Sequence, residues 1–232
     1  MALKNSISKV IIFDSGIIIN LVMNGLLEEF VELKKRFDGK FLITKDVSYE
    51  IIDKPMTIKR FKLEALKIKK LLDDKVLEMP SAVGIEDRQV SKMMNEVKDK
   101  ANNIFFGRGN AIQLIHSGEA SCMALSILLK EKNIDNVLSV DERTTRMLGE
   151  KPENLSVLLQ KKMHTEISMH DENLGYFKNF KFIRSTELMY VAYKKGIIKL
   201  KNHDVLDALL YALKLNGCSI SDGEINEIKK IG

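Results

Sequence analysis

Four acidic residues stand where a folded chain could bring carboxylates together. Asp14 and Asp141 each follow directly on a short apolar run, which is the pattern of a residue at the end of a buried strand. Glu50 comes shortly after a third such run, and Glu119 lies in the first turn of an expected buried helix. Carboxylates gathered without a cation would repel one another and raise their own pKa values. Because Mg²⁺ and Mn²⁺ prefer oxygen ligands, the four residues predict a site for one of these ions.

The elements that must position these acids alternate between short apolar runs and longer amphipathic segments, which is typical of an α/β fold around a parallel sheet. We expect five strands, at Lys9–Phe13, Phe41–Thr44, Lys75–Met79, Asn136–Val140 and Lys181–Arg184. We expect helices at Ile17–Phe37, Asp46–Asp53, Thr57–Asp73, Glu86–Phe105, Ala111–Lys132, Glu142–Gly149, Thr186–Lys195, Asp204–Asn216 and Ser221–Lys230, with Ser117 as an N-cap. Ligands of such sheets bind outside the carboxyl ends of the strands, where Asp14 and Asp141 are expected.

The composition is that of an ordinary folded protein. The 232 residues are 45% hydrophobic and contain no linker-like tract, so we expect residues 1–232 to form a single domain. No apolar run approaches the ~20 residues that span a bilayer, and the start lacks a secretory signal, so we expect a cytoplasmic protein with no membrane partner. The two cysteines are expected in the core, and the net charge of +5 permits a polyanionic partner.

The motifs "IIFDSG", "VSYEIIDKP", "GEASCMAL" and "LSVDERTTR" occur in this order and resemble the four acidic motifs of the PIN domain family of metal-dependent nucleases. The tail from "FIRSTELMYVAYKKGIIK" to "VLDALLYALKLNGCSIS" resembles the closing strand and helices of that fold. The resemblance covers most of the chain. It implies a three-layer α/β/α sandwich with a central parallel sheet, and Mg²⁺- or Mn²⁺-dependent cleavage of RNA, usually single-stranded.

Within the resemblance, Asp14, Glu50, Glu119 and Asp141 would be the catalytic and metal-binding quartet. Ser139 matches the small hydroxyl residue often found just before the fourth acid, where it would support the site without binding the metal. The chain is longer than compact members of the family, with extra sequence near 84–110 and 149–181. Substrate choice is open because it depends on these insertions.

Three charged residues follow the fourth acid closely. Glu142 stands where the family often has a second aspartate, so it could be an outer metal ligand or simply an acid favoured at the start of a helix. An acidic pocket repels nucleic acid, so phosphates must be bound by cations nearby. Arg143 and Arg146 lie within a turn of Asp141 and are candidates for RNA binding, although either could instead pair with a carboxylate.

Two functions remain from different classes. The first is a metal-dependent endoribonuclease, acting in RNA processing or turnover or as the toxin of a toxin–antitoxin pair. The second is a catalytically silent PIN-like module that binds RNA or a partner protein. The resemblance also implies a homodimer as one assembly, and an antitoxin or another protein as a partner. A phosphatase with an aspartate nucleophile is disfavoured because "DSG" lacks the second aspartate of such enzymes.

Overall fold

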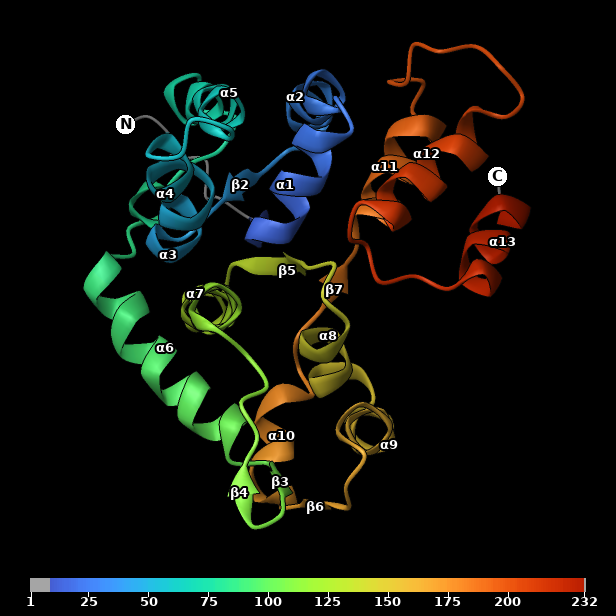
Figure 1. Cartoon of the computed structure of the whole chain (residues 1–232). Coiled ribbons are helices and arrows are strands. Elements are labelled where there is room, and N and C mark those ends of the chain that lie inside the picture. The colour runs from blue at the N-terminus through green and yellow to red at the C-terminus, as the bar shows by residue number, and fades with distance from the viewer. Residues whose placement is uncertain (1–8, 232) are drawn as a thin grey trace.

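A computed structural model describes residues 9 to 231, and its centre is a sheet of four parallel strands (Figure 1). The strands are β1 (Lys9–Phe13), β2 (Lys40–Leu42), β5 (Asp135–Ser139) and β7 (Phe182–Ile183), in the order β2-β1-β5-β7. Phe13 lies opposite Ser139 in the register of β1 and β5, so these two strands end side by side. Asp14 and Asp141 therefore follow neighbouring strand ends, as expected.

Helices cover both faces of this sheet. Figure 1 shows α1 and α2 on one side of β5, with α7 and α8 on the other, an arrangement compatible with three layers. The helices are α1 (Ser15–Met23), α2 (Leu27–Arg36), α3 (Lys45–Ser48), α4 (Lys54–Met56), α5 (Lys62–Asp73), α6 (Asp87–Asn102), α7 (Ser117–Glu131), α8 (Arg143–Glu150), α9 (Pro152–Met163), α10 (Leu174–Phe177), α11 (Ser185–Lys194), α12 (Val205–Leu215) and α13 (Asp222–Ile231). A π-helical turn, η1 (Tyr49–Asp53), joins α3 to α4, and 3₁₀ turns lie at Pro80–Val83 and Asp171–Asn173. Within residues 9–231, no helix combines the length and the apolar character needed to cross a membrane.

The core joins helix α2 to the sheet through aromatic side chains. The ring centroids of Phe13, Phe30 and Phe41 lie 4.9 to 5.1 Å apart, and all three side chains are at most 1% exposed. Such edge and tilted contacts are favoured between aromatic rings beyond their hydrophobic burial. Both cysteines are buried and free, as expected from the sequence. The packed core fixes the strand ends from which the acids project.

Several predicted elements differ from the observed ones. The expected single helix Ile17–Phe37 is wrong, because Gly25 adopts a left-handed φ of +69° and ends α1 before α2 begins. The expected strand Lys75–Met79 reaches the sheet through one parallel bridge between Leu42 and Glu78, so residues 9–231 form a sheet of four strands and not five. The N-cap of α7 is His116 and not Ser117.

The two extra segments expected near 84–110 and 149–181 pair with each other. Strand β3 (Phe105–Gly107) lies between β4 (Asn110–Ala111) and β6 (Ile167–Met169) in a small antiparallel sheet. The backbone N–H of His170 also donates to the carbonyl oxygen of Ile104 at 2.7 Å. Figure 1 shows this sheet beside α10, away from the parallel sheet.

Candidate active site

Asp14 is a buried carboxylate at the start of α1. It caps that helix, since the backbone N–H of Gly16 donates to its Oδ2 at 3.3 Å. Its Oδ1 is buried and has no hydrogen-bond partner within the part of the chain that the structure describes. Burial, then repulsion by Glu119 and more weakly by Glu50, raise the pKa of Asp14 from 3.8 to about 7, although backbone N–H groups act in the opposite direction. The site around Asp14 is therefore short of positive charge.

The first turns of α7 are held against the ends of two strands by small polar groups. Thr44, just after β2, shares a hydrogen bond of 2.6 Å with the hydroxyl of Ser121. Ser121 in turn donates to the carbonyl oxygen of Gly118 at 2.7 Å. The thiol of Cys122 points to the carbonyl oxygen of Phe13 at 3.7 Å. These contacts bring the start of α7 to the carboxyl edge of β1 and β2.

Glu50 and Glu119 reach the same edge from η1 and α7. A methyl group built at Gly118 would lie 3.0 Å from Oε2 of Glu50, so the glycine leaves room for that carboxylate. Oε2 of Glu119 accepts a hydrogen bond of 2.9 Å from the backbone N–H of His116, as in a capping box. Both acids act on the pKa of Asp14. Three of the four predicted acids thus share one electrostatic neighbourhood.

Asp141, the fourth predicted acid, follows the neighbouring strand but turns to other partners. Its Oδ1 accepts a hydrogen bond of 2.8 Å from the backbone N–H of Ser185, and its Oδ2 accepts one of 3.0 Å from the side-chain amide of Asn20. The same amide donates to the carbonyl oxygen of Leu213 at 3.0 Å. Asp141 is only 3% exposed, so these neutral donors supply the hydrogen bonds that its buried oxygens require. The carboxylate therefore faces α1 and the start of α11.

A divalent metal is the group that the resemblance implies. Within residues 9–231, no three His, Cys, Asp or Glu side chains are arranged as a set that could hold a metal ion. The chemistry of the donors nevertheless suits a hard cation, because Asp14 keeps a buried oxygen without a partner among the described residues and is repelled by the carboxylates of Glu119 and Glu50. Asp141 could add an oxygen to the set, since each carboxylate oxygen has a lone pair beyond the one used by its present donor.

Ser139 and Glu142 flank Asp141 and differ in their contacts. Ser139 is fully buried, and its hydroxyl has no partner among the described residues. Glu142 is exposed and caps α8, since its Oε2 accepts a hydrogen bond of 2.7 Å from the backbone N–H of Thr145. The sequence left two roles open for Glu142, an acid at the start of a helix and an outer metal ligand. The structure shows the first of these.

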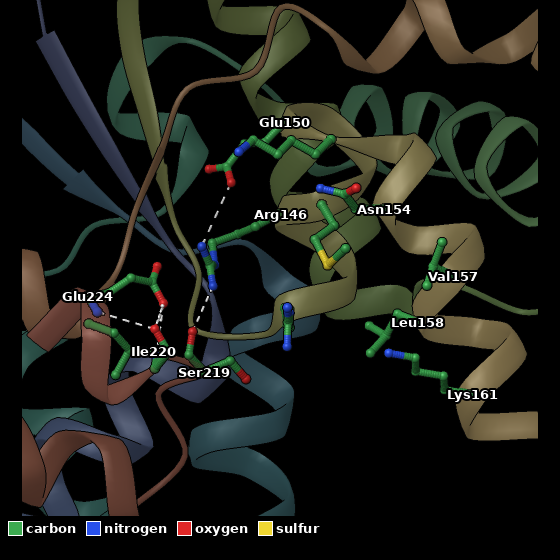
Figure 2. Close-up of a pocket in the computed structure, with 13 residues that line it drawn as sticks. Arg146, Glu150, Asn154, Val157, Leu158, Lys161, Ser219, Ile220 and Glu224 are labelled. Carbon is green, nitrogen blue, oxygen red and sulfur yellow. Dashed lines mark hydrogen bonds and ion pairs between the residues drawn. The ribbon is translucent and has the colours of Figure 1, made fainter.

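The two arginines after the fourth acid also differ. Arg146 is 8% exposed, and its Nη2 donates to the carbonyl oxygen of Ser219 at 2.8 Å while its Nη1 lies 3.8 Å from Oε2 of Glu150. It therefore pairs structurally, which was one of its two expected roles. The side chain of Arg143 is exposed. Both arginines line a pocket of about 870 Å³, shown in Figure 2.

Reasoning from the sequence did not single out Asn20 or Ser185, which engage Asp141. Asn20 is 1% exposed and interrupts the apolar run of α1. A lone amide inside a buried apolar stretch is a signal that could have found it, because such a group requires partners. The contribution of Ser185 is its backbone N–H, which leaves no mark in the sequence.

Comparisons with protein-family models, with curated proteins and with solved structures found no match to this chain.

Proposed function

We propose that this protein is a divalent-metal-dependent endoribonuclease that hydrolyses phosphodiester bonds of single-stranded RNA. The observation that carries the proposal is the buried Asp14, whose partnerless oxygen and raised pKa accompany two further carboxylates at the carboxyl edge of the sheet. An uncompensated buried carboxylate costs folding free energy, so it does not help to stabilise the fold. A binding site for a cation would give this arrangement a purpose, because the cation would compensate the buried charge.

Asp14, Glu50 and Glu119 would hold Mg²⁺ or Mn²⁺, with Asp141 as the fourth oxygen donor. The ion would polarise a water molecule and neutralise charge on the phosphoryl oxygens. The backbone N–H of His116 orients the carboxylate of Glu119, and Gly118 leaves the space that the carboxylate of Glu50 occupies. Asn20 and Ser185 fix the rotamer of Asp141, so that a lone pair on each of its oxygens remains for a further partner.

The test is cleavage of a fluorescent single-stranded RNA with Mg²⁺ or Mn²⁺ by the parent protein and by Asp14→Asn. Asparagine keeps the capping ability of aspartate, so the variant should fold. We expect cleavage to fall by about a hundredfold or more, because a direct ligand matters at least as much as its supporting residues. Asp87→Asn, which removes an exposed aspartate from the start of α6, is the matched control. Equal cleavage by Asp14→Asn and the parent would refute the proposal.

The second candidate, a silent PIN-like module, is favoured by one observation. Both oxygens of Asp141 already accept hydrogen bonds from neutral donors, as in a site that needs no metal. Titration with Mn²⁺ separates the candidates. Mn²⁺ that raises the melting temperature of the parent and not of Asp14→Asn supports the enzyme. An RNA-binding protein that neither cleaves nor responds to Mn²⁺ supports the silent module.

A further inference from the structure

The pocket of about 870 Å³ lies between α8 and α9 on one side and the segment Ser219–Ser221, just before α13, on the other (Figure 2). The backbone N–H of Ser219 donates to the carbonyl oxygen of Asp141 at 3.1 Å. One wall of the pocket is thus bonded directly to the residue that carries the fourth candidate acid. The volume lies in the range of pockets that enclose small ligands.

Arg146 fixes the two walls relative to each other. Figure 2 shows its side chain between Glu150 on α8 and Ser219 on the opposite wall, with the contacts described above. Its Nε is buried and has no partner among the described residues, so the guanidinium keeps an unused donor. The pocket is therefore preformed and has in its wall a guanidinium whose charge Glu150, at 3.8 Å and half exposed, offsets only in part, which favours an anionic ligand.

The other charges of the pocket add to this preference. Arg143, Lys151 and Lys161 line it with exposed side chains, and none of them forms an ion pair with a carboxylate in residues 9–231. Glu224 also lines it, but Arg184 lies 2.6 Å away from its Oε1. Burial tends to raise the pKa of Glu224, yet hydrogen bonds from Ser221 and Arg184 outweigh it and lower the pKa to about 2. The unpaired charges around the pocket are therefore mainly positive.

The remaining lining is partly apolar, with Asn154, Ser219 and Ser221 as its polar members. Met147, Val157, Leu158 and Ile220 contribute to the pocket, and Val157 is 51% exposed. A ligand that matches both the cationic and the apolar parts of the lining carries a phosphate and a flat apolar group. A nucleotide has this combination, since its phosphate binds cations and its base presents a flat face that can be buried against apolar side chains.

We propose that this pocket binds one nucleotide of a single-stranded RNA, with its phosphate at Arg143, Lys151 and Lys161 and its base against Val157 and Leu158. The inference rests on the proposed function for the identity of the strand. It adds a place where the RNA is held beside the candidate active site. It also gives α9, which belongs to the second insertion, a role in substrate binding.

The test measures fluorescence anisotropy of a labelled single-stranded RNA of about six nucleotides, a length that a single-strand binding site covers. EDTA is present, so that cleavage plays no part. We expect Lys161→Glu to weaken binding by about tenfold or more, as for the loss of a charged hydrogen bond, and to lower the salt dependence. Lys162→Glu is the matched control, because it makes the same charge change in the same turn of α9 at an exposed residue outside the pocket. Equal effects of the two substitutions would overturn the proposal.

A second probe tests the apolar half. We expect the same RNA with abasic positions to bind more weakly than the intact strand, by about fivefold for the apolar contact that the base loses with Val157 and Leu158. Equal binding of the two strands would overturn the assignment of a nucleotide. Neither measurement requires catalysis. If Lys161→Glu weakens RNA binding while Asp14→Asn and the parent cleave RNA equally, the proposed nuclease function is refuted and the proposed nucleotide pocket is supported.

Discussion

Asp14 should destabilise the metal-free fold at neutral and alkaline pH. Below pH 3.8 its carboxyl is protonated in both the folded and the unfolded chain and costs nothing. Between pH 3.8 and about 7 the unfolded chain releases this proton first, so unfolding becomes easier as the pH rises. Each pH unit in this window is worth about 1.4 kcal/mol. From pH 5 to pH 8 the group should therefore remove about 3 kcal/mol of stability.

Asp14→Asn removes this effect and keeps the cap of α1. Urea unfolding of the parent and the variant in EDTA, at pH 5 and pH 8, measures the difference. We expect the variant to be more stable at pH 8 and its advantage to shrink by about 3 kcal/mol at pH 5. Asp87→Asn should follow the parent at both pH values. Parallel pH profiles for the parent and Asp14→Asn would show that the raised pKa, and the reasoning built on it, are wrong.

Three further substitutions test other parts of the structure. Gly118→Ala puts a methyl group 3.0 Å from Oε2 of Glu50, so calorimetry should show Mn²⁺ binding weakened by about tenfold or more in a folded protein. Asn20→Leu leaves the buried Asp141 without one of its donors, and urea unfolding should show a loss of about 2–3 kcal/mol. Gly149→Ala places its Cβ 2.8 Å from an aromatic carbon, and thermal unfolding should show a loss of about 1–3 kcal/mol.

Each of these has an outcome that contradicts it. Unchanged Mn²⁺ affinity in Gly118→Ala would show that Glu50 does not bind the metal ion. Stability of Asn20→Leu equal to that of the parent would mean that its amide does not stabilise Asp141. Gly175→Ala is the control for Gly149→Ala, because nothing lies within 4 Å of its Cβ position, and equal losses in the two variants would exclude crowding as the cause.

The strand ends that carry Asp14 and Asp141 could be predicted because an apolar run followed by a polar residue marks a buried strand. The break between α1 and α2 carried a local signal, Asn24-Gly25, which is common at helix ends. That signal was outweighed by the apolar pattern around it. The stretch Lys75–Met79 has the apolar composition of a strand. Only Glu78 within it forms a bridge to β2 among the described residues, so composition alone overestimated its pairing.

The surroundings of the acids were less predictable. Whether Asp141 points to Asp14 or to Ser185 depends on where α11 packs, which the local sequence does not encode. The same holds for the pocket beside α8, since its walls come from segments distant in the chain. Glu142 could be either a ligand or a cap by its type and position, and the hydrogen bond from the backbone N–H of Thr145 that makes it a cap is seen only in the structure.

The pairing of β3 with β6 makes the segments near 84–110 and 149–181 mutually dependent. Phe105 is fully buried and Ile167 nearly so, and each strand supplies hydrogen-bonding partners for the other. A chain that kept one of these segments and lost the other would expose an unpaired strand edge, which promotes aggregation. In evolutionary terms, we expect the two segments to be acquired, shortened and discarded together.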